Sequence, residues 1–247
     1  AYEADDAAFH AKKLSGKDLV RWKYQRYAKN YLRCVRGVDD SVGELMATLK
    51  ELGLEENTIV VYSSDQGFYI GDHGWYDKRW MYEESLKMPL IIKWPGMTKP
   101  GSRNTMMVQN IDYAETFLEA AACDADPEMQ GESLVPLLAG ETPQDWRKKI
   151  YYHYYEFPSV HMVPRHYGIR TERYKLMHFY QFDEWEFYDL EEDPDELVNL
   201  YEDPAYAEKI NAMKQELTSL REQVEDDSDV SLAPDEFRSR FRKGQSL

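Results

Sequence analysis

The chain has 247 residues, of which 43% are hydrophobic, so it can bury a substantial core in one large or two smaller domains. Its formal net charge of -16 argues against a nucleic-acid groove, because phosphate binding requires clustered lysine and arginine, and an anionic substrate would need a local basic patch. No apolar run approaches the roughly 20 residues that a membrane span requires.

The first elements predicted along the chain are a long helix and a short buried strand. Residues 1–17 are polar and without a clear period, so we expect an irregular segment there. Apolar residues then recur at steps of three and four, which predicts a helix over residues 18–52 with one face packed on a sheet. That face comprises Tyr31, Val35, Val38, Val42, Leu45, Leu49 and Leu52. The β-branched run at 58–63 is typical of a buried parallel strand.

The middle of the chain predicts one more strand and one more helix. Residues 90–93 form a second apolar run, which Pro95 and Gly96 end. A helix is expected to begin at Asp112 and to end near Ala122. Residues 127–143 have the composition of a loop with one short apolar turn.

From residue 149 the pattern changes to short alternating runs that predict an antiparallel sheet. The expected strands are 149–153, 167–171, 174–179 and 186–190. A helix with one apolar face is expected over residues 206–224. From Glu225 the chain is acidic and then basic, so we expect it to be poorly ordered or to rest on the surface.

The most informative stretch follows the strand predicted at 58–63. Asp65 and Gln66 fall at the carboxyl end of that strand, where ligands bind in open α/β sheets. A carboxylate oxygen beside an amide oxygen suits a hard cation such as calcium or magnesium. Lys78, which follows the turn at Gly71–Gly74, would add a mobile positive charge for a substrate anion. These residues predict a site for an anionic ester beside a divalent metal.

Several segments in a fixed order carry a family resemblance. They are Ser64–Gly67, Gly71–Gly74, Lys78, Tyr82–Ser85, Met88–Gly96, Asn110–Leu118, Gly131–Gly140 and Tyr188–Glu196. Together they closely resemble the type I sulfatases, over roughly residues 18–222, and residues 151–176 are most similar to the bacterial branch that includes glucosamine 6-sulfatases acting on glycosaminoglycans.

The resemblance implies an α/β fold with two parts. Residues 1–148 would be part of an alkaline-phosphatase-like sulfatase sheet. Residues 149–247 would form a smaller α+β C-terminal subdomain with an antiparallel sheet and a terminal helix. The implied activity is hydrolysis of sulfate esters on a carbohydrate of the glycosaminoglycan type.

The resemblance also implies roles for individual residues. Asp65 and Gln66 would ligate calcium or magnesium, although Gln66 stands where relatives often have asparagine or histidine. Lys78 would be catalytic, gripping the sulfate oxygens and steadying the leaving oxygen, and His73 would brace the loop through a ring hydrogen bond. A substrate-binding set of Arg79, His161, Arg165 and His166 is expected at the mouth of the cleft. Its alternative is an aromatic-rich core in which the imidazoles are simply hydrogen-bonded.

The family nucleophile is a formylglycine made in a Cys-x-(Pro or Ala)-x-Arg signature, and this sequence does not contain that signature. Neither Cys34 nor Cys123 has the required neighbours. We therefore expect the chain to be the C-terminal half of a sulfatase, inactive alone, with the formylglycine in a missing N-terminal half. An uncovered inner face of the 18–52 helix would favour self-association or pairing with a complementary N-terminal chain.

Two other functions remain open at this point. Phosphonate or phosphodiester hydrolysis is the first, because that related family shares the spacing from Ser-Asp-x-Gly to lysine. The second is a non-catalytic module that binds a glycan or a complementary chain. The resemblance implies a periplasmic or secreted bacterial location, with a sulfated sugar as partner. The net charge and the lack of a long apolar run lead us to expect no nucleic-acid partner and no membrane.

Overall fold

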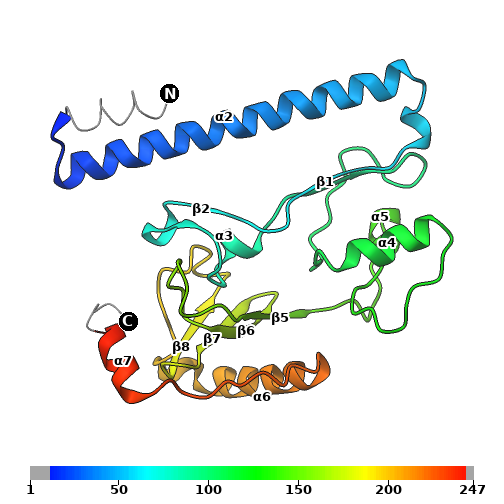
Figure 1. Ribbon diagram of the computed structural model, residues 1–247. Coiled ribbons are helices and arrows are strands. Elements are labelled where there is room, and N and C mark those ends of the chain that lie inside the picture. The colour runs from blue at the N-terminus through cyan, green and yellow to red at the C-terminus, as the bar shows by residue number, and fades with distance from the viewer. Residues whose placement is uncertain (1–11, 243–247) are drawn as a thin grey trace. The chain divides into compact units, whose positions relative to one another are not determined.

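The computed structural model describes residues 12–242. Contacts divide the chain into two compact units, described separately: the first comprises residues up to Val60 together with Phe68–Asp77, and the second comprises Val61–Gly67 together with the chain from Lys78 onward. Figure 1 gives the order of the elements along the chain. No helix within the described residues is long and apolar enough to cross a membrane.

The first unit consists of a long helix and a small hairpin. Helix α2 (Gly16–Glu51) begins inside the segment expected to be irregular, of which residues 1–11 lie outside the described part, and a 3-10 turn (Glu55–Asn57) follows it. Strands β2 (Tyr69–Ile70) and β3 (Tyr76–Asp77) pair antiparallel around a second 3-10 turn (Asp72–Gly74).

Helix α2 packs on this hairpin through aromatic rings. The rings of Tyr27 and Tyr31 stack on Phe68, and Tyr27 also meets Tyr76 edge to face. Tyr31 belongs to the predicted apolar face, so part of that face packs on the small β2–β3 unit, although no residue of α2 is buried. Other residues of the predicted apolar face are uncovered, with Leu45 54% and Leu52 65% exposed.

The second unit begins with a two-stranded sheet and a helical layer. Strand β1 (Val60–Ser63) pairs with β4 (Leu90–Lys93), and the short helix α3 (Glu83–Leu86) lies between them in sequence. Helices α4 (Asp112–Ala120) and α5 (Val135–Ala139) follow. Leu134, Leu137 and Trp146 form a core on which Leu90 and Ile92 of β4 pack.

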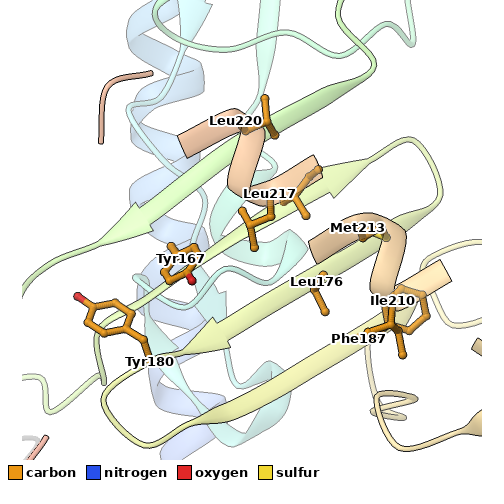
Figure 2. Close-up of a cluster of buried hydrophobic side chains, with 9 residues drawn as sticks. Tyr167, Leu176, Tyr180, Phe187, Ile210, Met213, Leu217 and Leu220 are labelled. Atoms are coloured by element: carbon orange, nitrogen blue, oxygen red, sulfur yellow. The ribbon is translucent and has the colours of Figure 1, made fainter. Parts of the chain in front are cut away.

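A four-stranded antiparallel sheet completes the second unit. Its strands are β5 (Lys149–Tyr154), β6 (His166–Thr171), β7 (Tyr174–Phe179) and β8 (Glu184–Asp189), in that spatial order. Ile169 lies opposite Leu176, which lies opposite Phe187, so the three share one face. Helix α6 (Ala207–Gln223) buries Ile210, Met213, Leu217 and Leu220 on that face (Figure 2).

Up to residue 242, the segment after α6 corrects the expectation that the chain from Glu225 is poorly ordered or rests on the surface; residues 243–247 lie outside the described part. Ala233 is buried and its N–H donates to the carbonyl of Gln181 at 3.0 Å. A further helix, α7 (Asp235–Arg242), follows, and Phe237 meets the rings of Phe157 and Phe182. The apolar residues that anchor this segment are widely spaced, so they produce no periodic pattern in the sequence. The domain boundary expected at residues 148 and 149 stays a prediction.

Candidate active site

The loop that leaves β1 carries Asp65 and Gln66 and is held by backbone contacts. Asp65 is exposed, Gln66 is partly buried and Gly67 is buried. The Gly67 N–H donates to the carbonyl of Ser85 at 2.7 Å. A Cβ at Gly67 would lie 2.0 Å from the carbonyl oxygen of Glu84, so the loop can lie against the α3 backbone only with glycine there.

Ser63 fixes the end of β1 from the other side. Its hydroxyl donates to the carbonyl of Pro89 at 2.9 Å and contacts the hydroxyl of Tyr113 at 2.7 Å. Tyr113 belongs to α4 and Pro89 directly precedes β4. The strand end from which Asp65 and Gln66 depart is therefore tied to both neighbouring elements.

Lys78 lies between two residues with an unfavourable backbone conformation. Asp77 has a φ of 83° and Arg79 a φ of 105°, a region that non-glycine residues rarely adopt. The Arg79 N–H donates to Ser85 Oγ at 3.2 Å, and the Arg79 carbonyl accepts from the Tyr152 hydroxyl at 2.7 Å. Lys78 is partly buried and belongs to the same compact unit as Asp65 and Gln66.

Ion pairs connect α3 to the four-stranded sheet. The ammonium of Lys175, which is fully buried, lies 2.9 Å from the carboxylate of Glu83 and 2.7 Å from that of Glu196. The guanidinium of Arg170 lies 3.2 Å from Glu83. Burial raises the pKa of Glu83, but Lys175 and Arg170 outweigh that effect and bring the pKa down to about 2. Glu83 is therefore charged at neutral pH, and its ion pairs fix the position of α3.

The donor chemistry of Asp65 and Gln66 fits a hard cation. Their side chains offer carboxylate and amide oxygens, the ligands that calcium and magnesium prefer. Within residues 12–242, no group of three or more histidine, cysteine, aspartate or glutamate side chains gathers in a geometry that could hold a metal. Asp65 and Gln66 would therefore supply two ligands of a larger set.

The remaining predicted site residues belong to both units. His73 lies in the first unit, in the turn between β2 and β3, with a φ of 54°. His161 is exposed, whereas Arg79 and Arg165 are partly buried, all in the second unit. The roles of these residues stay predictions.

His166 lies in the core of the second unit. Its side chain is fully buried, its Nδ1 is 2.8 Å from the carbonyl of Pro164, and Trp80 stacks on its ring. Burial lowers the pKa of His166 to about 4, so the imidazole is neutral at neutral pH. This is the hydrogen-bonded core histidine of the alternative interpretation, and we leave His166 out of the substrate-binding set.

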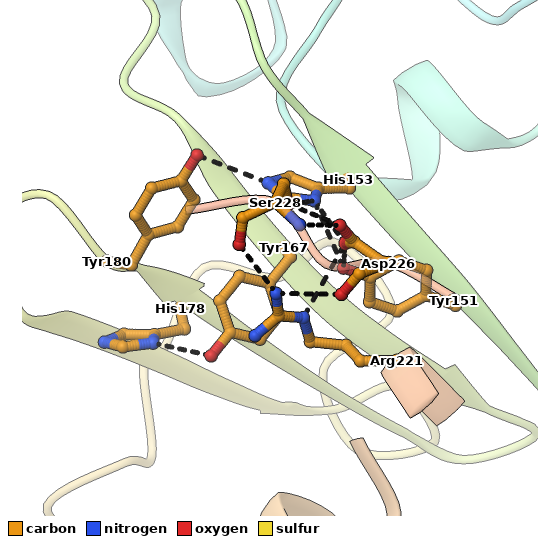
Figure 3. A network of polar contacts seen from close by, with 8 residues as sticks. All are labelled: Tyr151, His153, Tyr167, His178, Tyr180, Arg221, Asp226 and Ser228. Atoms are coloured by element: carbon orange, nitrogen blue, oxygen red, sulfur yellow. Dashed lines mark hydrogen bonds and ion pairs between the residues drawn. The ribbon is translucent and has the colours of Figure 1, made fainter. Parts of the chain in front are cut away.

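A buried polar network around Asp226 joins β5 to the segment after α6 (Figure 3). His153 Nδ1 lies 2.7 Å from the Asp226 carboxylate, to which the hydroxyls of Tyr151 and Ser228 also donate. Burial opposes ionisation of Asp226, but the bonds from Ser228, Tyr151 and His153 hold its pKa well below the usual range. No sequence pattern indicates this network, because β5 and the segment after α6 are far apart along the chain.

The network does not have the geometry of a Ser-His-Asp triad. Ser228 and Asp226 both approach Nδ1 of His153, while Nε2 lies 3.3 Å from the hydroxyl of Tyr180. In a triad the two ring nitrogens contact the serine and the aspartate separately. The network therefore holds the segment after α6 on the sheet and offers no activated nucleophile.

A cavity of about 540 Å³ opens elsewhere in the second unit. Its lining includes Leu86, Met88, Met106 and Tyr113, together with Glu83 and Arg170. Asp65, Gln66 and Lys78 do not line it. The cavity lining therefore includes none of these three predicted site residues, although Tyr113 in that lining contacts Ser63 at the end of β1.

Comparison with protein-family models decides the family. The model described as "N-sulphoglucosamine sulphohydrolase, C-terminal" matches residues 71–223, and the model described as "Sulfatase" matches residues 2–123. The chain belongs to the sulfatase family. It carries the alkaline-phosphatase-like sulfatase fold in its α/β part, as the sequence predicted.

Individual sulfatases and related enzymes are similar to this chain. It is 46% identical to the N-acetylglucosamine-6-O-sulfatase of Bacteroides thetaiotaomicron, over 99% of this chain and 43% of that protein. A solved structure, described as a complex with its substrate D-glucosamine-2-N,6-O-disulfate, has a TM-score of 0.88 and 46% identity, over 93% of this chain and 47% of that one.

A phosphonate monoester hydrolase of Agrobacterium radiobacter is also similar, with a TM-score of 0.68 and 28% identity, over 76% of this chain and 39% of that one. This sulfatase-family chain spans less than half the length of each of these relatives.

Proposed function

We propose that this chain forms part of the active site of a sulfuric ester hydrolase that removes sulfate from a glucosamine unit of a sulfated carbohydrate. The observation that carries the proposal is the placement of Asp65 and Gln66 at the end of β1, in one compact unit with Lys78. Identity of 46% with an N-acetylglucosamine-6-O-sulfatase supports the choice of substrate. Glycosaminoglycans contain such sugars.

In this proposal each residue has one task. Asp65 and Gln66 hold a divalent cation, calcium or magnesium, which polarises the sulfate oxygens when it is bound. The Lys78 ammonium contacts the sulfate and stabilises the negative charge that develops on the leaving oxygen. His73 braces the loop that contains it through a ring hydrogen bond. Arg79, His161 and Arg165 contact the sugar and its anionic groups.

The residues around Cys34 and Cys123 do not match the signature in which the family makes its formylglycine nucleophile. In our proposal it therefore comes from residues outside this sequence. A periplasmic or secreted location is part of the same proposal.

Replacing Lys78 with alanine tests the proposal. We expect Lys78→Ala, in the protein made from its complete reading frame, to lower kcat for sulfate release from glucosamine 6-sulfate by about 100- to 1000-fold, the usual cost of one donor to a developing oxyanion. Folding stability should change little, because Lys78 is only partly buried.

Lys99→Ala is the matched control, since Lys99 is an exposed lysine of the same unit. It should leave kcat unchanged. Equal kcat values for Lys78→Ala and the parent protein would contradict the role of Lys78.

Phosphonate or phosphodiester hydrolysis is the second candidate, favoured by the 28% identity to a phosphonate monoester hydrolase. The same protein should be assayed with phosphonate monoesters, phosphodiesters and sulfate esters under identical conditions. We expect kcat/KM to be highest for the sulfated sugar. A higher kcat/KM for a phosphonate or phosphodiester would contradict the sulfatase assignment and support the second candidate.

A further inference from the structure

Ser85 contacts two segments of the candidate site with different atoms. One is the metal-binding loop with Asp65 and Gln66, and the other is the lysine segment with Lys78. The Ser85 carbonyl oxygen accepts the N–H of Gly67 at 2.7 Å, and Gly67 directly follows the proposed metal ligands. Its Oγ accepts the N–H of Arg79 at 3.2 Å, and Arg79 directly follows Lys78. The side chain is buried, so water does not compete strongly for either bond.

The Arg79 peptide groups need such partners because the backbone there is strained. A φ of 105° at a non-glycine residue persists only when surrounding contacts enforce it. Ser85 Oγ holds the N–H of Arg79, and the Tyr152 hydroxyl holds its carbonyl at 2.7 Å. Lys78 precedes this clamped residue, so the direction of its side chain depends on the clamp.

Ser85 is itself held by the elements around it. It lies in α3, and the hydroxyl of Tyr82, the N-cap residue of that helix, donates to the carboxylate of Glu186 at 2.6 Å. Glu83 is paired with the fully buried Lys175. Both partners belong to the four-stranded sheet, so the position of Ser85 is set by β7 and β8.

We propose that Ser85 is a positioning residue that aligns Lys78 with the metal-binding loop. The proposal rests on the proposed function. Ser85 Oγ positions the segment that carries Lys78 through its bond to Arg79. The Ser85 carbonyl positions the loop that carries Asp65 and Gln66 through its bond to Gly67. Replacing the side chain should therefore disturb the segment of Lys78 and leave the metal-binding loop intact, because an alanine at this position retains the carbonyl.

A double-mutant cycle with Lys78 tests this assignment. In the protein made from its complete reading frame, Ser85→Ala should lower kcat by about 10- to 100-fold, the cost expected when a reacting group is misplaced by an ångström or less. KM and the calcium dissociation constant, measured by titration with calcium alone, should stay unchanged. In the Lys78→Ala background, Ser85→Ala should cause no further loss, because the group that it positions is gone.

Two more variants separate positioning from a purely structural role. Tyr152→Phe removes the hydrogen bond to the Arg79 carbonyl. It should lower kcat in the same way as Ser85→Ala, and again cause no further loss in the Lys78→Ala background. Thr116→Val is the matched control, since the buried Thr116 hydroxyl accepts the N–H of Leu134 at 2.8 Å, far from Lys78 in sequence. It should lower folding stability and leave kcat unchanged.

The outcomes distinguish the two proposals. Losses from Ser85→Ala and Lys78→Ala that multiply in the double variant would overturn the positioning role while leaving Lys78 as the catalytic residue. An equal loss of kcat in Thr116→Val would also overturn it. If Lys78→Ala alone had no effect on kcat, the proposed function would fail, and the positioning role with it.

Discussion

At the scale of single residues, burial determines how the histidines of the second unit ionise. His166 is fully buried and meets the rings of Trp80, Tyr152 and Phe179. Its pKa is lowered to about 4, and burial likewise lowers the pKa of His178 to about 4. The sequence analysis left two interpretations of His166, a substrate contact and a hydrogen-bonded core residue, because both occur beside aromatic residues.

The lowered pKa of His166 predicts a loss of stability at mildly acidic pH. An unfolded histidine has a pKa of about 6.5, so the unfolded state takes up a proton before the folded state does. The stabilisation is complete above that value and is lost as the pH falls from about 6.5 to about 4, by about 3 kcal/mol for His166. Urea unfolding at pH 7 and pH 4.5 measures this loss.

His166→Gln is the variant that isolates the effect, since glutamine does not titrate. Its free energy of unfolding should change less with pH than that of the parent. Protonation of Glu83 destabilises the protein only between about 4.5 and about 2, because its folded pKa is lowered to about 2, so it does not interfere above pH 4.5. A parent protein with the same unfolding free energy at pH 7 and 4.5 would contradict the buried, neutral His166.

At the scale of elements, the attachment of α3 to the sheet depends on Lys175. Its ammonium lies between the carboxylates of Glu83 and Glu196, and all three groups are largely buried. Lys175→Met keeps the length of the side chain but removes the cation that Glu196 pairs with, and it leaves Glu83 paired with Arg170. We expect the free energy of unfolding, measured in urea, to fall by about 3–5 kcal/mol.

Lys149→Met provides the comparison on the same sheet. The ammonium of Lys149 lies 3.2 Å from Glu216, but both side chains are more than a third exposed. The loss should therefore be at most about 1 kcal/mol. Similar losses for the two variants would show that Lys175 does not hold α3 in place.

The elements also show which patterns are readable from a sequence. The strands β4 and β7 have the bounds predicted from their apolar runs, and α6 differs from its prediction by one residue at each end. The short elements β2, β3 and α3 were missed, because two to four residues are too few for a period to emerge. Helix α7 was missed because its apolar contacts come from single residues such as Phe237.

At the scale of the whole molecule, the sequence predicts the candidate site in part. Asp65, Gln66 and Lys78 were singled out because they occur in order within one short stretch, and their roles stay predictions. Ser85 and Tyr152 were not, because their roles depend on hydrogen bonds to Arg79 that a single sequence does not reveal. The uncovered apolar face of α2 was readable from its periodicity.

The central claim is that Asp65, Gln66 and Lys78 act on one sulfate ester beside one cation. A crystal structure of the protein from its complete reading frame, with calcium and a 6-O-sulfated glucosamine bound, tests it most directly. We predict that the side-chain oxygens of Asp65 and Gln66 lie about 2.3–2.6 Å from the ion. The Lys78 ammonium should lie within hydrogen-bonding distance of the sulfate. An ordered loop with Asp65 and Gln66 pointing away from the ion, or a sulfate that Lys78 does not contact, would contradict the account.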